Sequence, residues 1–238
     1  MSTATVRRRR AQRGSGAQLR AEIVTAAKAL LEKSANSDAV SIRAVADAVG
    51  VTSPSIYLHF ADKDALIQAV VADVFAELDA AMVAAGESVD EPLAQLRAYG
   101  IAYVKFAVAH PEHYRVATME RCVPGDGHTE LDEIVADSAF THMMATVTAC
   151  MDAGIFAPGD PLPVTLQLWA AAHGIASLMI AKPYLPWGDV EAAADPVLRA
   201  AALGKATGDL IGGDLSPAVL TGWLAAQRAS RADQAPSE

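Results

Sequence analysis

The chain has 238 residues, of which 52% are hydrophobic, 20% charged and only 5% aromatic. This apolar content excludes an intrinsically disordered chain, and an excess of Ala, Leu and Val over aromatic residues favours helices over sheets. The net charge of −9 is unevenly distributed, because residues 1–70 carry +4 and residues 71–238 carry −13. A basic head on an acidic body is typical of a modular DNA-binding protein, since phosphates attract the head and repel the body.

The sequence gives no sign of export or membrane insertion. Cys122 and Cys150 stand alone, without the spacing of a zinc or redox site, and are expected to be reduced thiols. No apolar stretch follows the basic N-terminus, and the longest apolar run, residues 166–181, is interrupted by His173 and Gly174. We therefore expect a soluble cytoplasmic protein with no membrane partner.

The N-terminal part is predicted to be a basic arm followed by a helix. Residues 1–17 contain Arg7–Arg10 and then Gly-Ser-Gly, which indicates a flexible arm that either lies in solvent or enters a DNA groove. Over Leu19–Ser34 apolar residues recur every three or four positions, which predicts a first amphipathic helix.

Two further helices are predicted on either side of a tight turn at Gly50. Ser41 is placed to cap a helix that ends at Gly50, a residue suited to the left-handed C-cap conformation. Ser53 and Pro54 then restart a short helix that runs to about Phe60, with Ser53 as its N-cap and Pro54 in its first turn. A stop and restart within about three residues is typical of a helix-turn-helix.

A recognition helix presents polar side chains to base edges, while neighbouring groups hold the phosphates. The candidate DNA contacts are Ser41, Arg43, Thr52, Ser53, Ser55, Tyr57, His59 and Lys63. Taken singly, several of these have a structural explanation, such as a helix cap for Ser53 and a half-buried aromatic ring for Tyr57. Their spacing taken together favours DNA binding.

Beyond residue 64 the pattern predicts only helices, so the expected fold is all-α with about ten helices. The expected spans are residues 61–86, 92–109, 112–119, 131–154, 163–181, 196–211 and 217–228. In the first of these, Leu66, Val70, Val74, Leu78 and Met82 form one apolar row. We expect residues 18–64 to form the helix-turn-helix domain and residues 65–238 to form a ligand-binding and dimerisation domain.

The stretch SIRAVADAVGVTSPSIYLHFADKDAL resembles the DNA-binding domain of the TetR family of bacterial repressors, notably through Tyr57 in Y-x-H-F and Lys63 in K-x-x-L. Pro54-Ser55 departs from the family pattern, which leaves the base-reading residues open. The body resembles the subgroup with Trp-x-x-x-His-Gly, here residues 169–174, and His-Pro-Glu-His-Tyr-Arg, here residues 110–115. The resemblance implies a homodimeric repressor on a palindromic operator, with phosphate contacts from Tyr57 and Lys63, that is released by a small molecule.

The body should contain both a ligand pocket and a dimer interface. Candidates for an apolar pocket are Tyr99, Tyr103, Phe106, His142, Met143, Trp169 and His173, although each of these could equally be a core residue. Candidates for the dimer interface are Trp169, Ala201, Gly204, Gly208 and Ile211, because glycines in a helix allow close packing of a partner helix. The resemblance implies that helices 162–181 and 196–211 form a four-helix bundle with their partners.

Two other classes of protein share some of these features, an all-α enzyme and a helical scaffold. An all-α enzyme would need a catalytic or cofactor motif, and the one candidate metal group, His110 and His113 with Glu112 and Glu120 nearby, is interrupted by Pro111 and lacks paired Glu-x-x-His motifs. We therefore expect no enzymatic activity, metal or cofactor. A helical scaffold that has lost DNA binding is the second alternative, which DNA binding at several salt concentrations would distinguish.

Overall fold

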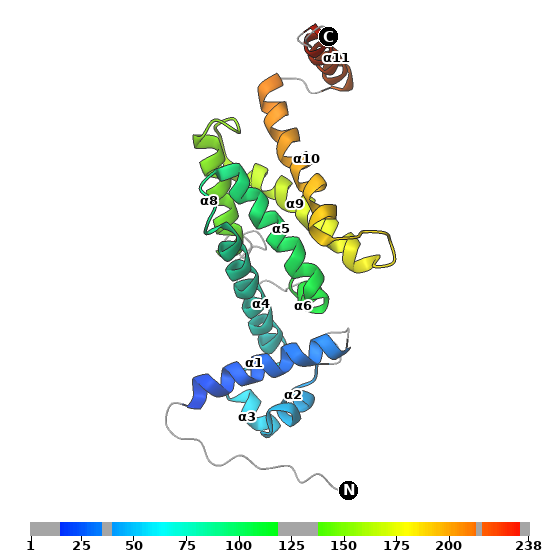
Figure 1. Ribbon diagram of the computed structural model, residues 1–238. Helices are drawn as coiled ribbons and strands as arrows, with labels where there is room; N and C mark the ends of the chain where they lie inside the picture. Colours follow the sequence, from blue (N-terminus) through cyan, green and yellow to red (C-terminus); the bar gives the residue numbers. More distant parts are fainter. Residues whose placement is uncertain (1–14, 35–39, 119–137, 213–215, 234–238) are drawn as a thin grey trace.

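The computed structural model describes residues 15–34, 40–118, 138–212 and 216–233 (Figure 1). These residues form ten helices and no strand, which confirms the predicted all-α fold. The helices are α1 (Ser15–Ser34), α2 (Ile42–Val49), α3 (Ser53–Tyr57), α4 (Lys63–Gly86), α5 (Pro92–Ala109), α6 (Pro111–Thr118), α8 (Ser138–Asp152), α9 (Pro161–Ala181), α10 (Val190–Ile211) and α11 (Pro217–Asp233).

Helices α1, α2 and α3 form a small unit at one end of the molecule, and α4 leads from it into the body (Figure 1). The apolar face of α1 is buried, with Ile23, Ala27 and Leu31 almost inaccessible to solvent. The helix begins at Ser15, so residues 15–17 of the predicted arm are helical, and residues 1–14 lie outside the described residues. The predicted division at residue 64 falls inside the first turn of α4, a helix that belongs to both parts.

The body consists of α4, α5, α6, α8, α9 and α10, with α5 packed against each of the other five (Figure 1). The predicted row from Leu66 to Met82 is buried along α4, because a long amphipathic helix must cover its apolar stripe. One apolar core extends from α1 into the body, and a second around Val147 and Phe156 lies between α8, α9 and the start of α5. Cys150 is buried there as a free thiol, and Cys122 lies outside the described residues.

The prediction that a helix begins at Pro196 was wrong, because α10 begins at Val190. The side chain of Asp189 caps it by accepting a hydrogen bond from Ala192 N at 2.9 Å. Pro196 lies inside the helix and has no backbone N–H to donate. Ala194 is fully buried in the same turns, and its packing against the core keeps this segment helical. Part of the helix predicted over 131–154 lies outside the described residues, and α8 covers the rest.

Among the described residues, α9 is the one helix long and apolar enough to cross a membrane. It lies within the body, however, packed against α5, α8 and α10. Leu168, Ala172, Ile175 and Met179 bury its apolar face there. The core therefore accounts for one face of α9, and 39% of its most apolar 18-residue stretch is buried.

Candidate DNA-binding and ligand-binding sites

The turn between α2 and α3 is fixed by backbone chemistry that the sequence predicted. Ser41 Oγ accepts a hydrogen bond from Ala44 N at 3.1 Å and so caps α2. Gly50 follows the helix with φ of 76°, and its N–H donates to Ala46 O at 2.9 Å. A side chain at this left-handed position would be strained, which explains the glycine and confirms the predicted C-cap.

The start of α3 differs from the prediction by one residue. Thr52 holds the extended N-cap conformation, and Ser53 is already helical, with Pro54 in the first turn. Thr52 Oγ1 lies 2.9 Å from Ser55 Oγ, so these two hydroxyls bond to each other instead of capping the helix. They can exchange this bond for one to DNA without leaving a buried polar group unpaired.

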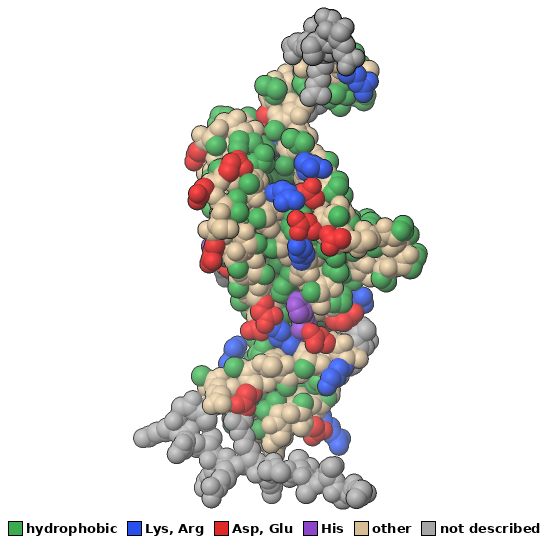
Figure 2. All heavy atoms as spheres, in the orientation of Figure 1, with side chains coloured by type: hydrophobic (Ala, Val, Ile, Leu, Met, Phe, Trp, Pro, Cys, Tyr) green, Lys and Arg blue, Asp and Glu red, His purple; other side chains and the backbone are tan. Residues whose placement is uncertain are grey.

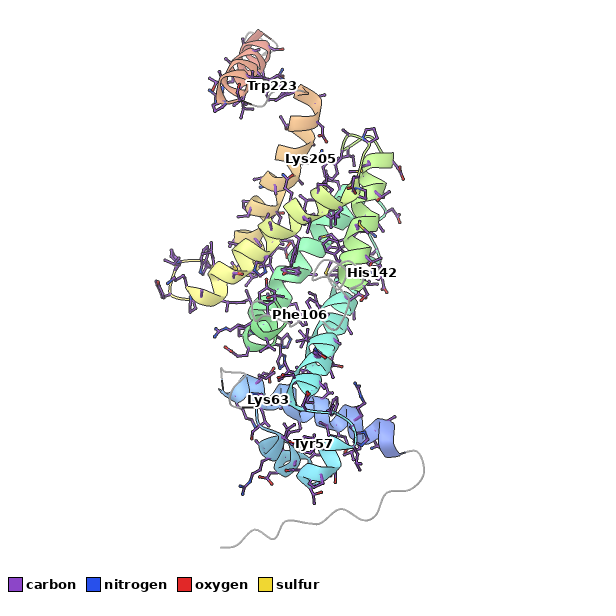
Figure 3. All side chains as sticks on the ribbon, turned by 180° about the vertical axis from the view of Figure 1, so that it is seen from behind. Tyr57, Lys63, Phe106, His142, Lys205 and Trp223 are labelled. Atoms are coloured by element: carbon purple, nitrogen blue, oxygen red, sulfur yellow. The ribbon has the colours of Figure 1, made fainter. Side chains whose placement is uncertain are left out.

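Helix α3 has one buried side and one exposed side, as its sequence predicted. Ile56 and Phe60 are buried, whereas the side chains of Tyr57 and Leu58 are 53% and 84% exposed. Figure 3 shows Tyr57 and Lys63 in the N-terminal unit, at the end of the molecule far from α11. An exposed aromatic at the end of α3 and an exposed leucine at its C-cap form a surface suited to a partner.

The remaining DNA candidates surround this helix. Arg43 is exposed on α2, and Lys63 is the first residue of α4, where Asp62 Oδ1 accepts from Ala65 N at 2.8 Å and fixes the helix start. His59 is half-buried beside Gly16 of α1. Arg20 of α1 also contacts this region, since its guanidinium lies 4.9 Å from the centre of the Phe60 ring. The sequence did not indicate this contact, because no spacing rule links α1 to that ring.

In the body, four polar aromatic side chains from three helices meet in a buried cluster. Trp169 Nε1 donates to Tyr103 Oη at 3.0 Å, and Tyr103 Oη lies 2.9 Å from Tyr114 Oη. His173 Nδ1 lies 2.6 Å from Tyr114 Oη and 3.4 Å from Tyr103 Oη. Both tyrosines are buried, so these bonds satisfy hydroxyls that have left water. We call these four residues the Tyr-Trp-His cluster.

The hydrogen bonds of this cluster have one consistent direction of donation. Burial raises the pKa of Tyr103 well above its ordinary value and raises the pKa of Tyr114, so both hydroxyls keep their protons. Burial also lowers the pKa of His173, which favours a neutral imidazole. The indole can only donate, so Tyr103 accepts from Trp169; a consistent arrangement has Tyr103 donating to Tyr114 Oη and Tyr114 donating to His173 Nδ1. The remaining imidazole proton is therefore on Nε2.

The other predicted pocket residues do not join these hydrogen bonds. Tyr99 is buried over Gly86, where its ring leaves no room for a Cβ atom, and Phe106 packs against His110 with ring centres 5.0 Å apart. Met143 is half-buried between the two apolar cores. The side chain of His142 is 46% exposed, and its Nδ1 lies 2.6 Å from Asp79 Oδ1 of α4 (Figure 3 labels His142). Tyr114 and Phe140, the latter edge-on to Trp169, were not predicted.

The predicted dimer-interface residues lie in different surroundings. Gly204 and Gly208 line an open groove of about 390 Å³ that also involves Gln167 of α9 and Asp209. Ala201 packs on the second core, and Ile211 is half-buried at the end of α10. Trp169, predicted for both sites, turns its indole toward the Tyr-Trp-His cluster. Both helices predicted to form the interface carry exposed leucines, namely Leu178 on α9 and Leu203 and Leu210 on α10.

Two family models match the sequence. Residues 23–70 match "Bacterial regulatory proteins, tetR family", and residues 96–201 match "Tetracyclin repressor-like, C-terminal domain". The chain belongs to the TetR family. It is therefore a transcription regulator with a helix-turn-helix and a ligand-binding C-terminal domain, not an enzyme. The Trp-x-x-x-His-Gly subgroup stays a prediction, because neither match addresses that motif.

Solved structures place the chain among other TetR-family folds. A protein of unknown function from Rhodococcus sp. RHA1 is 29% identical with a TM-score of 0.67, over 79% of this chain and 95% of that one. A TetR family transcription regulator from Marinobacter aquaeolei VT8 is 15% identical with a TM-score of 0.61, over 80% and 97%. RolR, solved in complex with resorcinol, is 16% identical with a TM-score of 0.59, over 82% and 96%. No curated protein matches the sequence significantly.

Proposed function

We propose that this TetR-family regulator is a cytoplasmic repressor that binds a palindromic operator as a homodimer and is released by a small apolar molecule. The observation that carries the DNA-binding part is the outward face of α3. Ile56 and Phe60 anchor the helix in the core, while Tyr57 and Leu58 project into solvent. The eight candidate side chains from Ser41 to Lys63 would then divide between base edges and phosphates.

Two copies are needed because one short recognition helix reads too few base pairs to be selective. The groove beside Gly204 and Gly208 supports a dimer formed by α9 and α10. A Cβ atom built on Gly204 would meet nothing within 4 Å among the described residues outside its own stretch of α10, so close packing against them does not explain this glycine. A partner helix packed on Gly204 would explain the glycine, and the exposed Leu203 and Leu210 would be covered in the same interface.

The effector would bind in the body beside the Tyr-Trp-His cluster. The cluster satisfies its own hydroxyls and leaves the His173 Nε2–H as a donor, beside the apolar core to which Tyr103 and Tyr114 belong. A small molecule with one acceptor and an apolar frame suits this environment. RolR, which shares the fold, is bound to resorcinol, a small aromatic compound of this general kind.

Release from DNA would be transmitted by α4, which begins at Lys63 beside α3 and runs into the body. Lys28 of α1 lies 2.7 Å from Asp73 Oδ2 and 2.6 Å from Glu77 Oε1, so the N-terminal unit is tied to α4 by two ion pairs. A ligand that moves α4 would therefore move the recognition helices away from the spacing of about 34–36 Å that B-DNA requires. The ligand must bind the displaced state more tightly for this to occur.

The test begins with the full-length protein and a random duplex DNA pool. Repeated selection should enrich a palindrome whose half-sites lie about one helical turn apart, bound by two chains in sedimentation of the complex. Enrichment of no sequence over competitor DNA would contradict operator binding and support the helical scaffold alternative. A compound identified by mass spectrometry of the purified protein should then weaken binding to the selected palindrome. A compound that binds the body but leaves operator affinity unchanged would contradict the proposed release.

A further inference from the structure

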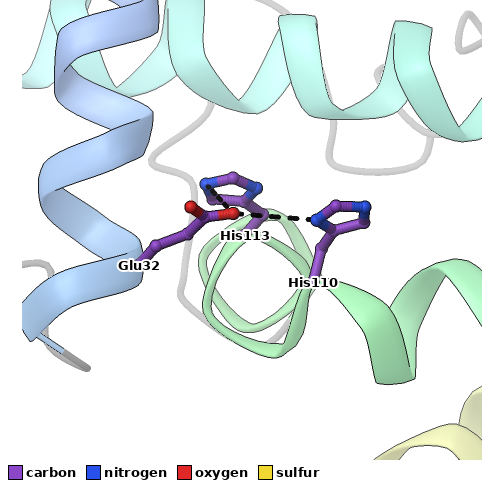
Figure 4. Close-up of side chains that lie close together, drawn as sticks. All are labelled: Glu32, His110 and His113. Atoms are coloured by element: carbon purple, nitrogen blue, oxygen red, sulfur yellow. Dashed lines mark ion pairs between the residues drawn. The ribbon is translucent and has the colours of Figure 1, made fainter.

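Three potential metal ligands meet where the N-terminal unit joins the body (Figure 4). Glu32 lies near the end of α1, His110 directly follows α5, and His113 lies in α6. Glu32 Oε1 is 3.7 Å from His110 Nδ1 and 3.7 Å from His113 Nε2. One ligand atom from each of the three residues lies within 4.8 Å of the other two.

The break between α5 and α6 brings the two histidines together. Pro111 cannot continue α5, so that helix ends and α6 begins directly after His110. The imidazole rings of His110 and His113 are stacked, with centres 5.8 Å apart and planes inclined by 11°. The proline that argued against a metal site in the sequence is thus what allows both rings to face α1. The third ligand, Glu32, is too distant in sequence for a motif to include it.

His113 has hydrogen-bonding capacity that no described residue uses. Its side chain is only 5% exposed, and its Nε2 lies 3.1 Å from the carbonyl oxygen of Lys28. Its Nδ1 is buried and has no hydrogen-bond partner among the described residues. With the proton on Nε2, the Lys28 carbonyl accepts it and the Nδ1 lone pair is left for a cation. A backbone carbonyl behind the imidazole is the usual support of a metal-bound histidine.

We propose that Glu32, His110 and His113 bind a divalent transition-metal ion, and that Zn²⁺ fits their chemistry best. Two imidazoles and one carboxylate are a known zinc ligand set, with metal–ligand distances of about 2.0–2.2 Å, which places tetrahedral ligand atoms about 3.3 Å apart. The 3.7 Å between Glu32 Oε1 and His110 Nδ1 needs only a small contraction. Glu32 and His110 can supply it by side-chain rotation, because they are 52% and 42% exposed. The 3.7 Å to His113 is measured to Nε2, which the Lys28 carbonyl holds, so the ion would lie on the Nδ1 side of that ring.

Solvent can provide the fourth ligand. Figure 2 shows histidine side chains at the surface, at the narrow waist between the two parts of the molecule, with acidic and basic side chains around them. A site with three protein ligands and one water is a common zinc arrangement. Because Glu32 belongs to the N-terminal unit and the histidines to the body, the ion would also tie the two parts together.

Direct titration tests the proposal. The tag-free full-length protein, stripped with a chelator, is titrated with Zn²⁺ in competition with a chromophoric indicator. We expect one ion per chain, and at least tenfold weaker binding by Glu32→Gln and by His110→Ala. His142→Ala and Asp79→Asn are matched controls, since they alter the other histidine–carboxylate pair, and they should bind as the parent does. Both test residues are partly exposed, so circular dichroism should confirm that the variants fold.

A second readout concerns stability. An ion bound only by the folded state raises the unfolding temperature, so excess Zn²⁺ should raise that of the parent and the controls but not that of Glu32→Gln. No saturable binding at micromolar Zn²⁺, or equal affinity of the parent and both variants, would overturn the proposal. Neither measurement contains DNA, so their failure leaves operator binding untouched.

Discussion

The hydroxyl of Tyr114 lies 2.6 Å from Nδ1 of His173 and so joins α6 to α9 inside the body. The same hydroxyl accepts from Tyr103, which in turn accepts from the indole of Trp169. Helix α9 therefore shares one line of hydrogen bonds with α5 and α6, which lie much earlier in the sequence. The orientation of the line depends on protonated tyrosines and a neutral histidine, which is what burial favours for all three groups.

Replacing Tyr114 by Phe should therefore lower the free energy of unfolding. The substitution removes one hydroxyl and leaves the buried Tyr103 hydroxyl and His173 Nδ1 without their shortest bonds. Loss of a partner for buried polar groups costs about 1–3 kcal/mol. Urea unfolding measures this, with Tyr184→Phe as the control, because Tyr184 is exposed and should lose almost nothing. Equal midpoints for Tyr114→Phe and the parent would show that the hydroxyl is not part of a stabilising network.

His173 should make stability depend on pH in a particular direction. Burial lowers its pKa in the folded state below the ordinary 6.5, so the unfolded chain binds this proton more readily. Its contribution is complete above about pH 6.5 and is lost as the pH falls below that value toward the lowered pKa. Protonation would also remove the acceptor for the Tyr114 hydroxyl.

The measurement is the unfolding free energy of the parent and of His173→Gln between pH 5 and pH 8. The parent should lose stability more steeply than the variant on the acid side. Tyr184→Phe, at an exposed residue, is the control for general acid effects and should follow the parent. Parallel curves for the parent and His173→Gln would contradict a coupled, buried imidazole.

The N-terminal unit was predictable because its signals are local. Ser41, Gly50 and Pro54 act on backbone atoms within a few residues, so their roles can be read from neighbouring letters of the sequence. The one-residue error at Thr52 has a local cause too, since Thr52 and Ser53 are both suitable caps and the Thr52 hydroxyl bonds instead to Ser55.

The sites in the body were only partly predictable because their members come from different helices. Trp169 and His173 share a helical face and were paired correctly, whereas Tyr114 enters the cluster from α6 and no spacing indicated it. His142 is 46% exposed on α8, where its Nδ1 lies 2.6 Å from Asp79 Oδ1 of α4, and no spacing in the sequence indicated that contact. In α10, buried Ala194 and the Asp189 cap outweigh the usual preference of Pro196 for a helix start.

Lys63 should hold a phosphate, and salt dependence can test that role separately from base reading. Lys63→Ala should weaken binding to every DNA sequence and reduce the slope of log affinity against log salt concentration by about one per bound chain, and so by about two for the dimer. Fluorescence anisotropy at four or more salt concentrations provides the slope, on both the selected palindrome and unrelated DNA. Lys182→Ala, at an exposed residue that follows α9 in the body, should leave the slope unchanged. An unaltered slope for Lys63→Ala would remove Lys63 from the set of phosphate contacts.

Gly204 provides the test of the dimer interface, because a Cβ atom added there meets nothing within 4 Å in the described part of the chain beyond its own stretch of α10. Gly204→Glu should leave the protomer folded, since replacing a helical glycine relieves a penalty of about 0.5–1 kcal/mol relative to Ala. In a close helix–helix interface the same carboxylate would be buried without a partner, which strongly disfavours association. Sedimentation velocity should therefore find dimers for the parent and monomers for Gly204→Glu, with unchanged helical content. Ala145→Glu, at an exposed position of α8, should remain dimeric. A Gly204→Glu protein that sediments as the parent does would place the interface elsewhere on the body.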